Sequence, residues 1–186
     1  MKRLIKQLLS LPRFLFYKMR NNSIDLSSEI GSNTHLRDSR IGKWCHIGPR
    51  GNVNSAVIGN YTCVAPSCQI GGMEHPYWDL SISPLLSDEC KFGKTTYIGH
   101  DVWIAANCII RQGVTVGDGA VIGANSFVNK DIPPYAIAYG TPVKVVKYRF
   151  DDRTIQDLNE SHYWEYQPRE ARRILDNIKQ NKTESI

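Results

Sequence analysis

Branched aliphatic residues return at every sixth position through the middle of the chain, at Ile98, Ile104, Ile110, Val116, Ile122 and Val128. An amphipathic helix repeats every three to four residues and a half-buried strand every two, so a period of six fits both. Five glycines share this segment: Gly99, Gly113, Gly117, Gly119 and Gly123. Each would cost a helix interior about 1 kcal/mol relative to Ala, whereas the Val, Ile and Thr around them favour extended chain. The pattern therefore predicts short strands joined by turns and stacked into a parallel β-helix.

The same pattern runs earlier in the chain and shows the size of one coil. Aliphatic residues there follow steps of six, six and five, so Ile24, Ile41 and Ile58 are 17 positions apart. Three sub-repeats per period predict a triangular coil with three flat faces. We expect coils at 24–40, at 41–57 and from 58 onward, with two more starting near Ile98 and Val116. Five coils at strand spacing give a prism about 25 Å tall.

The residue directly after the aliphatic position is small, as at Gly99, Ala105, Gly117 and Gly123. Glycine tolerates backbone dihedrals that other residues avoid. We therefore expect these positions to form corners with unusual dihedral angles.

Composition is that of a folded domain with appendages. The chain has 186 residues, of which 41% are hydrophobic and 22% charged, ordinary values for one globular domain. The net charge of +5 comes mainly from the first 22 residues, which hold six basic residues and no acidic one. The remainder is close to neutral, so no nucleic-acid partner is expected.

The five cysteines indicate a reducing compartment. Cys45, Cys68 and Cys108 each follow a repeat aliphatic by four positions, where small residues stand in other repeats. A free cysteine fits such a slot as a small buried hydrophobe. The odd number predicts no disulfide framework, and the cytoplasm is the expected location. A zinc site from Cys63 and Cys68 would need two more ligands, which the spacing does not supply, so no metal is expected.

Residues 1–20 form a basic, amphipathic segment interrupted by Pro12. It has no apolar run long enough to span a bilayer and no cleavage signal of a secreted protein. Two interpretations remain open. The segment caps the open end of the first coil or packs on a subunit interface, or it is an interfacial helix that contacts the inner face of the membrane.

The hexads stop after Ile70 for 27 residues and resume at Ile98. Long loops within a repeat array are usually functional. This one carries the run Glu74, His75, Pro76, Tyr77, Trp78 and Asp79. A histidine beside aromatic residues suits a general base at a cleft. The alternative is a loop that only packs against a neighbouring subunit, and the residues alone do not separate the two.

With the hexads, the stretch "EHPYW" and the run "GHDVWIAANCIIRQGVTVGDGAVIGANSFVNKDIPPYAIAYGTPVKVVKYRF", residues 24–166 resemble the hexapeptide-repeat acyltransferases. The last part resembles the branch of chloramphenicol and streptogramin acetyltransferases and their polysaccharide O-acetyltransferase relatives. The resemblance implies a left-handed parallel β-helix, an exception to the rule that parallel crossovers are right-handed.

The resemblance also implies a function. Acetyl-CoA would donate its acetyl group to a hydroxyl of a sugar or surface-polysaccharide precursor, in a homotrimer whose donor groove lies between two subunits. His75 would be the general base, and the backbone N–H of Ala106 would stabilise the oxyanion. Positions matching the coenzyme groove are Trp103, Ala105, Ala106, Ala124, Lys130 and Lys144, the two lysines near the phosphates. Positions matching the acceptor site are Glu74, Tyr77, Trp78 and Asp79.

Two features of the loop depart from the pattern of the drug-modifying members, and two alternative functions are considered. Glu74 stands where drug-modifying members usually have a polar residue of an Asn-His pair, and the loop is shorter than in some of them. Antibiotic acetylation is therefore the alternative acceptor chemistry. An alternative of another class is a zinc-dependent, carbonic-anhydrase-like β-helix, which needs three histidines at matched coil positions. His35 and His46 are not one coil apart.

The predicted organisation has three parts: an amphipathic segment at 1–22, the β-helix at 23–145 with its loop at 71–97, and a helical extension at 146–186. Within the extension, we expect a capped helix from Asp151 and a second helix with Pro168 at its first position. His100 is expected to pack at its turn or to contact the acceptor.

Overall fold

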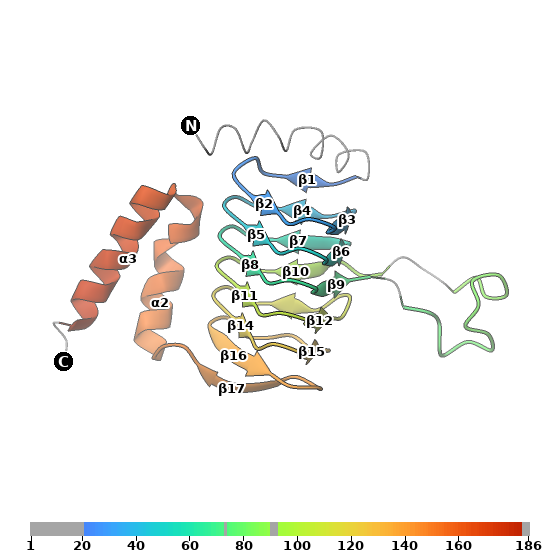
Figure 1. Ribbon diagram of the computed structural model, residues 1–186. Helices are drawn as coiled ribbons and strands as arrows, with labels where there is room; N and C mark the ends of the chain where they lie inside the picture. The colour runs from blue at the N-terminus through green and yellow to red at the C-terminus, as the bar shows by residue number, and fades with distance from the viewer. Residues whose placement is uncertain (1–20, 73, 90–92, 184–186) are drawn as a thin grey trace.

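The chain folds into a β-helix with two helices on one side and a long loop on the other (Figure 1). The structure, a computed structural model, describes residues 21–72, 74–89 and 93–183. The expectations for residues 1–20 therefore lie outside the described residues. The predicted left-handed parallel β-helix is confirmed.

Three parallel sheets form the faces of the prism. Sheet A contains β1 (Ser23–Ile24), β4 (Arg40–Ile41), β7 (Ala56–Ile58), β10 (Thr96–Ile98) and β13 (Thr115–Val116). Sheet B contains β2 (Glu29–Ile30), β5 (His46–Ile47), β8 (Cys63–Val64), β11 (Trp103–Ile104), β14 (Val121–Ile122), β16 (Ala136–Tyr139) and β17 (Lys144–Tyr148). Sheet C contains β3 (His35–Arg37), β6 (Asn52–Asn54), β9 (Gln69–Gly71), β12 (Ile109–Ile110) and β15 (Phe127–Val128).

The register confirms the coils that the period predicts. Ile24 pairs with Ile41 and Ile41 with Ile58, each 17 residues on. Across the long loop, Ile98 pairs with Ile58, so the insertion leaves the stack unbroken. Sheet B then continues into β16 and the antiparallel strand β17, which the sequence did not predict.

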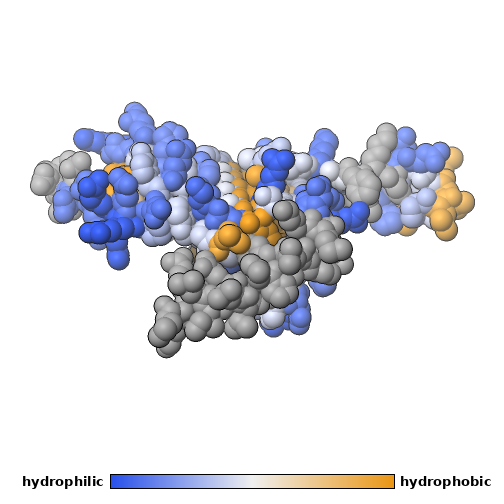
Figure 2. All heavy atoms as spheres, turned by 90° about the horizontal axis from the view of Figure 1, so that it is seen from above, coloured by the Kyte–Doolittle hydropathy of each residue, from blue (hydrophilic) through white to orange (hydrophobic). Residues whose placement is uncertain are grey.

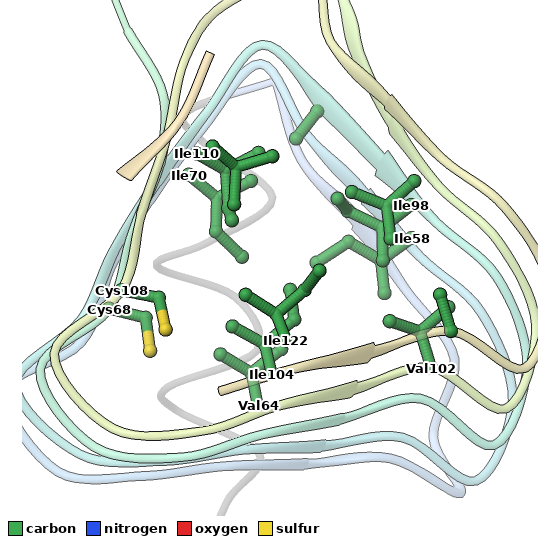
Figure 3. Packing of buried hydrophobic residues seen from close by; sticks show 14 of the residues in the cluster. Ile58, Val64, Cys68, Ile70, Ile98, Val102, Ile104, Cys108, Ile110 and Ile122 are labelled. Atoms are coloured by element: carbon green, nitrogen blue, oxygen red, sulfur yellow. The ribbon is translucent and has the colours of Figure 1, made fainter. Parts of the chain in front are cut away.

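The repeat aliphatics fill the interior of the prism (Figure 3). Cys68 and Cys108 lie side by side there, and these two residues and Cys45 are buried, as predicted. The four cysteines of the described residues are all free. Burying each aliphatic contributes roughly 1.5–3 kcal/mol, which makes the stack the main source of stability.

The small corner residues were expected to adopt unusual dihedral angles, and this expectation was wrong. Left-handed dihedral angles occur two positions later, at residues such as Asp101 and Asn107. Gly99 and Gly117 have no room for a side chain, because the backbone of the next coil passes close to them. A Cβ on Gly99 would lie 2.7 Å from the Asp118 nitrogen, and one on Gly117 would lie 2.4 Å from the Pro134 nitrogen.

A ladder of side-chain acceptors joins the coils at the corner between sheets A and B. The N–H of Lys43 donates to Asn60 Oδ1 at 2.8 Å. The N–H of Asn60 donates in turn to His100 Nδ1 at 2.9 Å, and that of His100 to Asp118 Oδ1 at 2.6 Å. Each coil thus satisfies the corner N–H of the coil before it, which would otherwise lack a partner.

The C-terminal helices pack against this corner. Helix α2 (Asp152–Ser161) is capped by Asp151, whose carboxylate accepts from the Thr154 N–H, as predicted. The 3-10 helix η1 (Tyr163–Glu165) and α3 (Pro168–Thr183) follow, the latter with the expected proline at its start. Trp164 stacks on His100 with ring centroids 5.2 Å apart. His100 therefore packs at its turn, one of its two expected roles.

Candidate functional site

The loop leaves the β-helix after β9 and returns at β10. Its neck is narrow, because a Cβ on Gly93 would lie 2.4 Å from the Gly72 carbonyl oxygen and would overlap Gln112 Oε1. Its outer end is apolar and exposed, with Leu80, Ile82, Leu85 and Leu86 uncovered by the described residues. Figure 2 shows these hydrophobic atoms at the end of the molecule opposite the C-terminal helices.

His75 lies just beyond the neck with an exposed side chain. Its Nδ1 is 2.7 Å from the carbonyl oxygen of Ile82. Because a carbonyl only accepts hydrogen bonds, the neutral ring carries its proton on Nδ1. Nε2 then keeps a free lone pair, the atom that a general base needs.

Glu74 is held by Arg111, which follows β12 on the neighbouring coil. Nε and Nη2 of Arg111 donate to the two carboxylate oxygens of Glu74 at 2.5 and 2.7 Å. The hydrogen bond from Arg111 lowers the pKa of the Glu74 carboxyl below its ordinary value. Such bidentate pairs are the most geometrically defined of charged contacts. Glu74 thus anchors the loop, and its contact with an acceptor stays a prediction.

The other expected acceptor residues differ in their exposure and partners. Tyr77 and Trp78 are exposed and meet edge to face, with ring centroids 5.1 Å apart. Asp79 accepts from the Ser87 hydroxyl and, at 2.7 Å, from the Leu80 N–H. The Ser87 bond is the main cause that lowers the Asp79 pKa. The aromatic pair therefore presents open surface, whereas Asp79 mainly orders the loop.

Three of the expected coenzyme residues, Ala105, Ala106 and Ala124, lie at the corner between sheets B and C. Ala106 and Ala124 occupy the second turn position of successive coils, where earlier coils carry Pro49 and Pro66. The Ala106 and Ala124 N–H groups have no hydrogen-bond partner among the described residues, whereas Ala105 N–H donates to Ile122 at 2.9 Å. Two N–H groups without a partner among the described residues therefore lie at the same turn position of successive coils.

Trp103 and Lys144 lie near that corner, whereas Lys130 lies at the opposite end of sheet C, where the chain passes towards sheet A. Trp103 stands on β11 and is 54% exposed, so the described chain leaves much of its surface uncovered. Lys130 follows β15 and Lys144 begins β17, and both are exposed. The loop leaves the far end of sheet C and projects away from the prism (Figure 1). Within one subunit, no hydrogen bond or ion pair between described residues links His75 to this corner.

Arg111 and Gln112 contact the base of the loop, and neither was predicted as a functional residue from the sequence. Arg111 directly follows Ile110, in a slot that holds Gly or Ala after Ile98, Ile104, Val116 and Ile122. After other aliphatics of sheet C, however, the same slot holds Arg37, Asn54 and Asn129, so nothing in the sequence set Arg111 apart.

Among the described residues, no group of three or more His, Cys, Asp or Glu side chains could hold a metal ion. No helix among the described residues is long and apolar enough to cross a membrane.

Comparison with known proteins agrees with this architecture. Residues 95–130 match the family described as "Bacterial transferase hexapeptide (six repeats)". A chloramphenicol acetyltransferase from Agrobacterium fabrum (strain C58) is 54% identical over 69 residues, covering 37% of this chain and 33% of the relative. The galactoside O-acetyltransferase of Escherichia coli (strain K12) is 33% identical over 128 residues, covering 64% of this chain and 58% of that protein. The chain spans between about a third and under two thirds of the length of the curated relatives it matches.

Among solved structures, a hexapeptide-repeat acetyltransferase from Vibrio cholerae, complexed with acetyl coenzyme A, superposes with a TM-score of 0.65. It is 25% identical, and the match covers 81% of this chain and 87% of that one. The six-residue period, the three-sheet prism and the matched repeat agree: residues 95–130 match the hexapeptide-repeat family, and the fold is that of a hexapeptide-repeat acetyltransferase of known structure.

Proposed function

We propose that the protein is an acetyl-CoA-dependent O-acetyltransferase that transfers an acetyl group to a hydroxyl of a sugar or surface-polysaccharide precursor. The observation that carries the proposal is the loop histidine, whose Nδ1 is held by the Ile82 carbonyl, so that the unprotonated nitrogen of the neutral ring is Nε2. The acetyltransferases named among the relatives, and the neighbour complexed with acetyl coenzyme A, support the choice of donor.

The proposed chemistry is direct transfer. His75 Nε2 takes the proton as the acceptor hydroxyl oxygen attacks the thioester carbonyl carbon. The carbonyl oxygen becomes an oxyanion, which the Ala106 N–H stabilises by a hydrogen bond. The C–S bond then breaks, the coenzyme thiolate takes the proton from His75, and the products are the acetyl ester and free CoA. An alcohol is too weakly acidic to ionise near neutral pH, so the base supplies an essential step.

The proposed donor path runs along the corner between sheets B and C. Small side chains at Ala105, Ala106 and Ala124 let a thin pantetheine arm approach the backbone. The N–H groups of Ala106 and Ala124, which have no partner among the described residues, would provide donors along that path. Lys144, exposed at the start of β17, and Lys130, exposed at the far end of sheet C, would attract the phosphates as point charges.

The proposed partner is a second and third copy of the chain. The loop and the corner groove lie at opposite ends of sheet C, so one subunit alone does not bring His75 to Ala106. The exposed Trp103 and the apolar end of the loop are surfaces that a neighbouring subunit would cover. A homotrimer with three-fold symmetry would place a loop of one subunit beside the groove of the next.

The acceptor class rests on the loop. Tyr77 and Trp78 present exposed aromatic faces suited to the apolar side of a sugar ring. Antibiotic acetylation is the second candidate, because curated relatives named chloramphenicol acetyltransferase match the same part of the chain. The four free cysteines fit the proposed cytoplasmic location. Contact with the inner face of the membrane through residues 1–20 concerns residues outside those described.

The test is a thiol-release assay with acetyl-CoA and a panel of sugars, nucleotide sugars and antibiotics. His75→Ala should lower turnover by about 10²–10⁴-fold with the preferred acceptor. His35→Ala is the matched control, because His35 is an exposed histidine on β3 outside the loop, and it should keep wild-type turnover. Turnover of His75→Ala within threefold of wild type, at unchanged oligomer mass, would remove His75 from the mechanism.

A further inference from the structure

The base of the loop is held by side chains from the next coil. Arg111 and Gln112 follow β12, and both face the segment that precedes His75. Arg111 clamps both oxygens of Glu74, the residue directly before the histidine. A side-chain hydrogen bond from Gln112 to the same carboxylate contributes to its lowered pKa, after the larger effect of Arg111.

The other stem of the loop is packed on the same two residues. Gly93 approaches Gln112 so closely that any Cβ there would overlap Gln112 Oε1. Lys94 lies over Gly113, where a Cβ would meet the lysine side chain at 3.0 Å. Both stems of the loop therefore rest on residues 111–113 of a single coil.

Beyond the neck, the loop has little support of its own. Its helix-free segment is held by short-range bonds, such as Tyr77 N–H to the His75 carbonyl at 2.8 Å and Asp79 N–H to the Pro76 carbonyl at 3.0 Å. The large apolar side chains at its outer end are mostly uncovered by the described residues. The orientation of His75 relative to the coil thus depends on the bonds at the neck.

We propose that Arg111 is a positioning residue, which through its two-point pair with Glu74 sets the place of the His75 imidazole relative to the coil. This inference rests on the proposed function of His75 as a base. Arg111 touches neither donor nor acceptor in this assignment; it acts through Glu74, its main partner, and through a side-chain hydrogen bond with Tyr77. Misplacing a catalytic group by about 1 Å can cost up to 10²-fold in rate, so loss of the pair should affect turnover more than donor binding.

The first arm of the test is kinetic. Arg111→Met keeps the length of the side chain and removes its charge and its fork of donors, and it should lower kcat by about 10- to 100-fold. The KM for acetyl-CoA should stay within about twofold, because the proposed donor groove lies at another corner. The double variant Glu74→Arg with Arg111→Glu, which reverses the pair, should recover most of the lost turnover. Arg173→Met, which breaks the exposed Glu170–Arg173 pair on α3, is the matched control and should be neutral.

The second arm does not depend on activity. Amide hydrogen exchange at Tyr77 and Asp79 should be about tenfold faster or more in Arg111→Met than in wild type, while β12 exchanges unchanged. Unchanged exchange at these amides would overturn the proposal whatever the kinetics show.

The arms separate this inference from the proposed function. If His75→Ala is inactive while Arg111→Met stays within twofold of wild type, the positioning role is wrong and the base is retained. If His75→Ala retains full turnover, the base assignment fails, and with it the inference. A fall in kcat that tracks only the folded fraction, and that the reversed pair does not restore, would also overturn the positioning role.

Discussion

Lowering the pH should weaken the contact between the β-helix and its C-terminal helices through His100. His100 Nδ1 accepts the Asn60 N–H at 2.9 Å, and its ring stacks on Trp164. Protonation of Nδ1 turns the acceptor into a second donor, so the Asn60 N–H loses its partner. Burial is the main cause that lowers the His100 pKa below 6.5, with His162 adding to it and Asp118 and Glu165 opposing it.

The sign follows from proton linkage. A histidine whose pKa is lower in the folded state binds fewer protons there than in the unfolded chain, so acid favours unfolding. The stabilisation is present above the unfolded pKa of 6.5 and is lost as the pH falls below it towards the lowered folded value. Leaving the half-buried Asn60 N–H unsatisfied costs about 1–2 kcal/mol. For a chain of this length that corresponds to a fall of about 2–8 °C in Tm.

The variant His100→Asn isolates this effect. Asn60 itself shows that an asparagine at this corner accepts the N–H of the preceding coil through Oδ1, and asparagine does not titrate. Thermal melts between about pH 7.5 and about pH 5, at one protein concentration, should show a smaller loss of Tm in His100→Asn than in wild type. Parallel losses of Tm in the two proteins would refute the reasoning.

Two further predictions concern the donor site and the assembly. Lys144→Ala should raise the KM for acetyl-CoA more than it lowers kcat, with an effect that shrinks at high salt. A raised acceptor KM with an unchanged donor KM would show that Lys144 contacts the acceptor rather than acetyl-CoA. Light scattering should give a mass near three chains, and Trp103→Glu should reduce it, because a charge replaces an exposed aromatic that we place at the interface; an active wild-type monomer would contradict the trimer.

The sequence alone determined the β-helix and the size of its coil. The six-residue period of glycine, valine and isoleucine is a local pattern that recurs in every coil. The register of Ile24, Ile41 and Ile58 follows from this period. The buried cysteines and the cap at Asp151 were likewise local features. The loop was visible as an interruption of the period, and His75 as the one histidine in its sequence.

Only the tertiary structure decided what holds that histidine and why the corner glycines are required. Arg111 and Glu74 are 37 residues apart, and their pairing follows from the stacking of coils rather than from any period. The proton position on His75 depends on the Ile82 carbonyl, which lies across a turn of irregular loop. Gly99 and Gly117 are explained by the backbone of the following coil, a neighbour in space that spacing along the chain does not reveal.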